Sequence, residues 1–175
     1  MGINPEYEGV NMEETYEIES RPRRKILIAT DGSETANEAA DFGIEMMGCS
    51  GAKIYAVHVI DITPYRSVSL DKIWSKETLD EHEKEGYEAT SYIERVAKAS
   101  GVEVESRILK GDPAEKIVSF AEDNGIDMII VGSLGKGGYD RLILGSVSEK
   151  VIRHAKVPVL VVRERHKSEK KLIQA

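Results

Sequence analysis

The sequence has 175 residues, of which 41% are hydrophobic and 31% charged, a composition typical of one globular domain. Its net charge of -7 argues against a nucleic-acid surface, and no apolar run approaches the roughly 18 residues of a membrane-spanning helix. The single cysteine, Cys49, excludes an internal disulfide, and the four histidines show no metal-ligand spacing. Because the start also lacks an export signal, we expect a cytoplasmic protein that binds neither nucleic acid nor membrane.

The two ends of the chain differ from its middle. The first 20 residues carry six glutamates and no lysine or arginine, with almost no apolar periodicity. We therefore expect residues 1–22 to be a flexible acidic extension, a partner site being the less favoured alternative. A single domain should occupy residues 23–165, followed by a basic tail over residues 166–175 whose role the sequence leaves open.

Short apolar runs alternate with amphipathic stretches from Lys25 onward. In chain order, the pattern predicts a strand over residues 26–29, a helix capped by Ser33 or Thr35, a strand over 54–60, a long connection over 61–74 that could be a lid, a helix over 75–100, a strand over 102–109, a helix capped by Asp112, a strand over 126–131, a helix opening at Ser146 and a strand over 157–162. The strands are apolar on both faces, so helices should cover both sides of a mostly parallel sheet. The expected fold is α/β, a doubly wound, open, five-stranded parallel sheet of the Rossmann-like type.

The strongest functional signal is the glycine-rich segment over residues 131–148, between the fourth predicted strand and the last helix. Ligands of such sheets bind beyond the carboxyl ends of the strands. Glycine accepts positive φ and has no Cβ, so backbone N–H groups can approach a phosphate, and the start of a helix adds unpaired donors. The residues expected to form this phosphate cradle are Val131, Gly132, Ser133, Gly135, Lys136, Gly145, Ser146, Val147 and Ser148. The competing interpretation is that the glycines only permit turns, that Ser146 only caps the helix and that Lys136 and Arg141 are solvated surface charges.

Two further residues lie near the expected site. Asp31, after the first strand, could accept a ribose hydroxyl or help to hold a phosphate-bound cation, although capping its own turn is the interpretation that the sequence favours. His58 is interpreted as a core histidine rather than a catalytic one. The sequence contains no G-x-x-x-x-G-K-[ST] or G-x-S-x-G motif, and no G-x-G-x-x-G follows the first strand. We therefore expect no catalytic residue.

The spacing Gly132-x2-Gly135-x9-Gly145-Ser146 resembles the nucleotide-binding signature of universal stress proteins, in their ATP-binding branch. Residues 25–33, 58–61 and 157–162 are similar to that family's first strand and turn, second-strand ending and closing strand. The resemblance covers about residues 23–165 and implies an adenine nucleotide alpha hydrolase-like fold that holds ATP with Mg or Mn. It implies that the glycines and hydroxyls of the cradle take the phosphates and ribose. The residues that it adds to the site are Val59, which would contact the adenine, and Ala29, Thr30 and Asp31, beside the nucleotide.

The resemblance implies a regulatory protein of the stress response. We expect at most slow ATP hydrolysis, because no positioned general base is evident. The resemblance also implies a homodimer through residues 157–162, an apolar edge that needs cover, the alternative being that a helix or loop shields the edge. An unknown protein partner could read the nucleotide state near residues 61–74. The alternatives are an adenylating or nucleotide-transfer enzyme of the related fold, or a dimeric interaction module without nucleotide.

Overall fold

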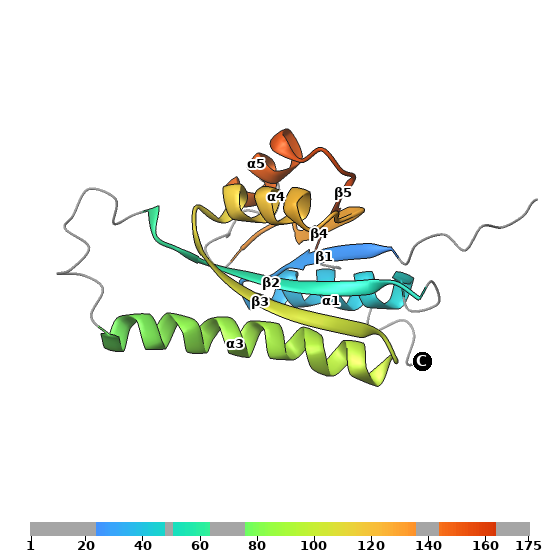
Figure 1. The fold of residues 1–175 in the computed structure, drawn as a ribbon, viewed down its shortest axis with the longest axis horizontal. Helices are drawn as coiled ribbons and strands as arrows, with labels where there is room; N and C mark the ends of the chain where they lie inside the picture. Colours follow the sequence, from blue (N-terminus) through green and yellow to red (C-terminus); the bar gives the residue numbers. More distant parts are fainter. Residues whose placement is uncertain (1–23, 48–50, 64–75, 136–143, 164–175) are drawn as a thin grey trace, which may run out of the picture.

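The computed structural model describes residues 24–47, 51–63, 76–135 and 144–163 of the chain. They form a five-stranded sheet in the order β3-β2-β1-β4-β5, in which all neighbouring strands are parallel (Figure 1). In chain order the elements are β1 (Lys25–Ala29), α1 (Glu34–Met47), β2 (Lys53–Asp61), α3 (Lys76–Ala99), β3 (Glu103–Gly111), α4 (Pro113–Asp123), β4 (Met128–Gly132), α5 (Ser146–His154) and β5 (Val159–Val162). The predicted doubly wound α/β fold is confirmed.

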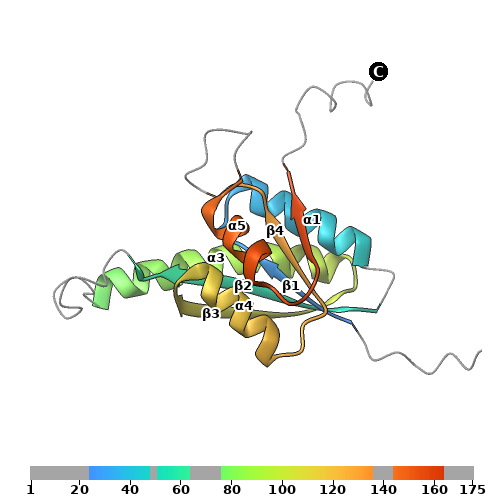
Figure 2. The same cartoon turned by 90° about the horizontal axis from the view of Figure 1, so that it is seen from above.

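Each face of the sheet has its own hydrophobic core, because successive side chains of a strand point to opposite faces. On β1, Ile26 and Ile28 pack with residues of α1 and α3, such as Ile44 and Ile93. Leu27, between them, packs on the other face with residues of α4 and α5. Figures 1 and 2 show these two helix pairs on opposite sides of the sheet. Strands that are buried on both faces read as continuous apolar runs, which is why the sequence showed them clearly.

The strands differ in length, and this difference shapes the functional end of the sheet. The pairing of β1 with β2 ends at Ala29 and Val57. The pairing of β2 with β3 continues to Asp61 and Gly111. The carboxyl edge of the sheet therefore has a step, with β2 and β3 extending beyond the end of β1.

Two of the predicted helix caps are confirmed. The hydroxyl of Ser33 accepts a hydrogen bond of 3.2 Å from the N–H of Ala36, in the first turn of α1. Asp112 Oδ1 accepts hydrogen bonds from the N–H groups of Ala114 and Glu115, at 3.0 and 3.2 Å, and Pro113 begins α4. These caps fix the starts of both helices at the carboxyl edge of the sheet.

The two edge strands differ in character. Lys53 of β2 pairs with Glu103 and Glu105 of the edge strand β3, at 3.4 and 2.6 Å. The opposite edge is the apolar run Val159–Val162, in which every residue is partly exposed. It begins two residues later than predicted. Pro158 lies just before it, and its carbonyl accepts the N–H of Ile129 on β4.

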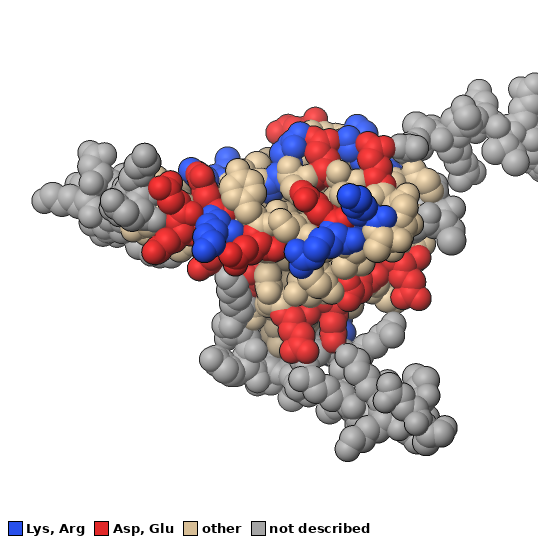
Figure 3. All heavy atoms as spheres, turned by 90° about the horizontal axis from the view of Figure 1, so that it is seen from below, with Lys and Arg blue, Asp and Glu red and all other residues tan. Residues whose placement is uncertain are grey.

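The outer face of α3 is a mixed-charge surface. Figure 3 shows acidic and basic side chains interspersed across this side of the molecule. From residue 78 to the end of α3, the exposed charged residues are Asp80, Glu81, Lys84, Glu85, Glu88, Glu94, Arg95 and Lys98. None of the helices in the described ranges has both the length and the apolar character needed to cross a membrane.

Candidate functional site

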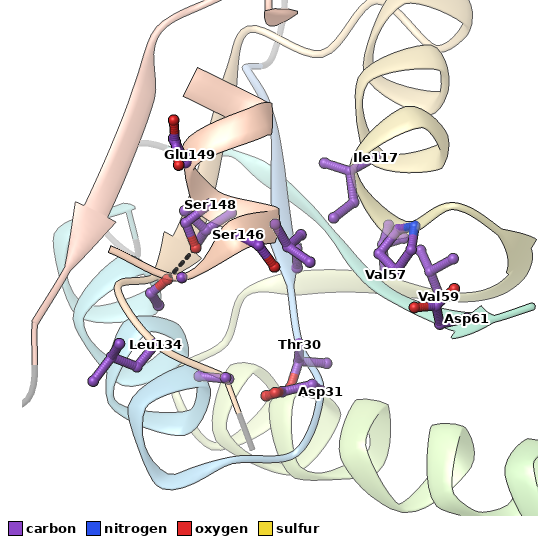
Figure 4. Close-up of a pocket in the computed structure, with 18 of the residues that line it drawn as sticks. Thr30, Asp31, Val57, Val59, Asp61, Ile117, Leu134, Ser146, Ser148 and Glu149 are labelled. Carbon is purple, nitrogen blue, oxygen red and sulfur yellow. Dashed lines mark hydrogen bonds between the residues drawn. The ribbon is translucent and has the colours of Figure 1, made fainter. Parts of the chain in front are cut away.

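A cleft of about 860 Å³ opens at the stepped carboxyl edge of the sheet. Its walls come from the ends of β1, β2 and β4, from the loop residues before α5, and from the first turns of α4 and α5 (Figure 4). The structure brings together here most of the site residues predicted from the sequence: Ala29, Thr30, Asp31, Val59, Val131, Gly132, Gly135, Gly145, Ser146, Val147 and Ser148. Segments far apart in the sequence thus share one cavity.

Two predicted site residues are not among those that line the cleft. Ser133 is buried, with its N–H donating to the carbonyl of Val162 and its own carbonyl accepting the N–H of Gly145, both at 2.8 Å. Its role is to join the end of β4 to β5 and to the start of α5. Lys136 and the second basic candidate, Arg141, lie outside the described residues, as does most of the predicted lid.

Several lining residues were missed by the sequence analysis, namely Ala36, Val57, Asp61, Pro113, Ile117, Leu134, Leu144 and Glu149. A usable signal existed for two groups of them. Pro113 follows the third strand, so it lies at the same sheet edge as the residues after the first and fourth strands. Val57 and Asp61 flank Val59 at the two-residue period of a strand, so they share its face.

The first turn of α5 is open toward the cleft. The helix begins at Ser146, and the residue before it, Gly145, provides no side-chain cap. The interpretation of Ser146 as the helix cap is therefore wrong. The first N–H groups of a helix have no acceptor within the helix, so those of residues 146–148 are available where they line the cleft. The N–H of Gly145 is not, contrary to the expectation, because it donates to Ser133.

Ser148 also differs from the expectation. Its hydroxyl donates a hydrogen bond of 2.7 Å to the carbonyl oxygen of Gly132, and the residue is buried. The hydrogen of this hydroxyl therefore serves the protein rather than a ligand, although the oxygen can still accept. Ser146, the first residue of the same helix, has an exposed side chain that lines the cleft.

The described glycines of the segment matter because they lack a Cβ, as expected, but the positive φ that was also expected is not found at them. Gly132, Gly135 and Gly145 are not among the positive-φ glycines of the described chain. A Cβ at Gly132 would lie 3.1 Å from the backbone of Thr35, and one at Gly135 would lie 2.7 Å from Asp31 Oδ2. These glycines allow β4 to approach α1, and the following loop to approach Asp31.

Asp31 both caps its turn and lines the cleft. Its Oδ1 accepts the N–H of Ser33 at 3.0 Å, and the hydroxyl oxygen of Thr30 accepts the N–H of Gly32 at 3.0 Å. Gly32 has a φ of 78°, which other residues rarely adopt. The capping role predicted for Asp31 is confirmed, and Oδ2 faces the position of Gly135.

His58 belongs to the core, as predicted. It is 8% exposed, and its Nδ1 lies 2.9 Å from the carbonyl oxygen of Thr30. A carbonyl only accepts, so Nδ1 carries the hydrogen of this bond. The imidazole thus holds the turn of residues 30–33 in place. It lies on the sheet face opposite to Val57 and Val59, where it packs against Gly86 of α3.

The charged groups around the cleft are engaged with neighbours. Glu149 pairs with Arg153 at 2.8 Å, and Lys150 approaches Asp112 Oδ2 at 3.4 Å, joining α5 to the cap of α4. The N–H of Glu115 and, after it, the Lys150 ammonium lower the pKa of Asp112, against a rise from burial. Within the described ranges, no three His, Cys, Asp or Glu side chains come together to hold a metal ion.

The chain is similar to known proteins along most of its length. The sequence model of the universal stress protein family matches residues 22–163. Universal stress protein MJ0531 of Methanocaldococcus jannaschii is 40% identical over 143 residues, which are 81% of this chain and 82% of that protein.

Solved structures agree with this assignment. Protein MJ0577 of the same archaeon superposes with a TM-score of 0.72 at 35% identity, over 82% of this chain and 98% of that chain. The universal stress protein from Archaeoglobus fulgidus in complex with dAMP gives a TM-score of 0.60 at 25% identity, over 80% and 97% of the two chains. By sequence and by fold, this chain belongs to the universal stress protein family.

Proposed function

We propose that this chain binds an adenine nucleotide, ATP above all, in the cleft and acts as a regulatory protein through that binding. One observation carries the proposal: two sets of backbone hydrogen-bonding groups that no described residue uses face the same cavity. One set belongs to β2 beyond the end of β1, and the other to the first turn of α5. The first suits the edge of a base, and the second suits a phosphate.

The base would bind at the step in the sheet. Residues of a parallel strand direct their N–H and C=O groups to alternate neighbours. The carbonyl of Val57 accepts the N–H of Thr30, so the backbone groups of Val57 face β1. The N–H of Ile62 donates to the carbonyl of Gly111, so the backbone groups of Ile62 face β3. Val59 therefore directs its N–H and C=O past the end of β1. This donor and acceptor pair matches the N1 acceptor and the amino donor of adenine.

The walls at this end of the cleft suit an aromatic ring. They are apolar, with Ala29, Val57 and Val59 from the sheet and Pro113 and Ile117 from α4. A pocket of about 860 Å³ lies in the range of roughly 300–1,000 Å³ that small-molecule sites occupy. Burial of the purine between these side chains would supply affinity, and the backbone pair of Val59 would orient the ring.

The phosphates would bind at the open start of α5. Its N–H groups and the positive end of the helix dipole favour an anion, and Ser146 can add its exposed hydroxyl. Mg²⁺ or Mn²⁺ would be held chiefly by the phosphates, with Asp31 or Glu149 as a further oxygen ligand. The dAMP complex of the Archaeoglobus relative supports an adenine nucleotide as the ligand.

Holding the nucleotide fits the site better than rapid hydrolysis. The carboxylates that line the described cleft are engaged by neighbours: Asp31 by Ser33, Asp61 by Thr63 and Glu149 by Arg153. A general base must lie within hydrogen-bond reach of the attacking water, whereas we place Asp61 beside the adenine and Asp31 or Glu149 on the cation. We therefore propose at most slow turnover of ATP. We also propose a homodimer that forms through β5 and whose subunit contacts respond to nucleotide occupancy.

Two measurements test the proposal. The purified protein is denatured and its released small molecules are identified by mass spectrometry, and ATP binding is measured by calorimetry with and without Mg²⁺. Absence of both a released adenine nucleotide and ATP binding would refute the proposal. Ser146→Asp should weaken ATP binding by about tenfold or more, because its carboxylate competes at the helix start while stabilising the helix itself. Ser146→Ala is the matched control and should keep most of the affinity, since the backbone donors remain.

A further inference from the structure

Asp61 is the last residue of β2, and its carboxylate lines the cleft next to Val59 (Figure 4). The two side chains are two residues apart in one strand, so they point to the same sheet face. Asp61 Oδ1 accepts hydrogen bonds from the N–H and the hydroxyl of Thr63, at 2.8 and 2.6 Å. This turn holds the carboxylate in place and leaves Oδ2 to accept a bond from a ligand.

The direction of β2 orders the groups of a bound base. The chain runs from Val59 to Asp61, so the N–H of Val59 comes first along the strand and its C=O lies nearer to Asp61. If N1 of a purine accepts the N–H of Val59, the substituent at C6 must lie beside the carbonyl of Val59. An amino group there has two hydrogens, one for the Val59 carbonyl and one directed onward along β2, where Asp61 lies about 6.6 Å further by strand spacing.

We propose that Asp61 is a specificity-determining residue, which makes the cleft select purine nucleotides with an amino group at C6. This inference rests on the proposed nucleotide binding at Val59. The carboxylate accepts the second amino hydrogen in a charge-assisted bond. A base with a carbonyl oxygen at C6 would turn lone pairs toward both the Val59 carbonyl and Asp61, so repulsion adds to the lost bond.

The test compares ATP with purine riboside triphosphate, which lacks the amino group and keeps N1. Affinities of both are measured by calorimetry for the full-length wild type and for Asp61→Ala. The wild type should bind ATP more tightly than purine riboside triphosphate. In Asp61→Ala the ratio of the two affinities should fall by about tenfold, the worth of one hydrogen bond to a charged group. Both ligands are triphosphates, so removal of the negative charge of Asp61 changes their two affinities alike. The ratio of the ATP affinity to the purine riboside triphosphate affinity is therefore free of this general effect.

Two further variants sharpen the comparison. Asp61→Asn keeps an acceptor without the charge and should give an intermediate ratio. Asp123→Ala removes an exposed carboxylate at the far end of α4 and should leave the ratio unchanged. An unchanged ratio in Asp61→Ala, with ATP still bound, would overturn the role of Asp61 alone. Failure of the wild type to bind either nucleotide would overturn this role together with the proposed function.

Discussion

The hydroxyl of Ser148 donates a hydrogen bond of 2.7 Å to the carbonyl oxygen of Gly132, which joins the first turn of α5 to the end of β4. The two residues lie on opposite sides of the glycine-rich segment, 16 positions apart. Their bond holds together the two described ends of the segment at the cleft. The serine that the sequence suggested as a ligand donor is thus a structural link that keeps the start of α5 in position.

Ser148→Ala should lower the free energy of unfolding by about 1–3 kcal/mol, because the buried carbonyl of Gly132 loses its hydroxyl donor. Urea denaturation measures the loss. Ser146→Ala, an exposed serine of the same turn, should change stability by less than about 0.5 kcal/mol. Equal effects of the two substitutions would contradict the structural role of Ser148.

Gly132→Ala should destabilise the protein by about 1–3 kcal/mol through overpacking. The new Cβ would lie 3.1 Å from Thr35 backbone atoms and 3.2 Å from the N of Ala36, and backbone cannot move aside cheaply. Gly135→Ala is the matched comparison, because its Cβ would meet only the end of the Asp31 side chain, which can rotate. Thermal unfolding should rank Gly132→Ala as the less stable variant, and the reverse order would show that our account of these glycines is wrong.

The cap of α4 should give stability that depends on pH. The pKa of Asp112 is lowered in the folded protein, so its charged form contributes stability above the unfolded value of about 3.9. This contribution is lost as the pH falls through the lowered pKa. Asp112→Asn keeps the acceptor and removes the charge, so it should cost about 0.5–1 kcal/mol at pH 7, a modest value because the group is partly exposed.

Chemical denaturation of both proteins at pH 7 and near pH 3 measures this effect. The difference between the wild type and Asp112→Asn should shrink toward the lower pH, because the carboxyl of Asp112 becomes protonated as the pH falls toward its lowered pKa. A difference that stays constant over this range would show that the charge of Asp112 contributes nothing to the cap.

Strand pairing through β5 can be tested with proline. The carbonyls of Pro158 and Val162 accept hydrogen bonds from the N–H groups of Ile129 and Ser133, so the even-numbered residues of β5 face β4. Val161 is odd-numbered and therefore directs its N–H away from β4, to the open edge of the sheet. Val161→Pro removes a donor that only a partner strand could use, and it should weaken a dimer by about tenfold in sedimentation equilibrium. Leu160→Pro removes a bond within the sheet and should instead destabilise the fold. A dimer unaffected by Val161→Pro would exclude pairing through this edge.

The fold could be predicted from the sequence because local patterns determine most of it. Apolar runs gave the buried strands, and Asp112 with Pro113 gave the start of α4 correctly. The ends of strands were less accurate, since they depend on neighbours: β3 continues to Gly111 because β2 pairs with it there.

The site was predicted less completely, for a physical reason. The glycine spacing identified the segment, but hydrogen bonds between distant segments decide which of its donors are free. The N–H of Gly145 is used by Ser133, and this bond leaves no local pattern. Ile117 was missed because only the three-dimensional arrangement brings this part of α4 opposite Val59.

The unequal edges of the sheet limit how large an assembly can grow. If two chains join through their β5 strands, the combined sheet has a β3 strand at each outer border, where Glu103 and Glu105 pair with Lys53 of β2. Charged side chains at such a border oppose the addition of another strand. Assembly by this route would therefore terminate at two subunits, and the same charged border would oppose growth into fibrils.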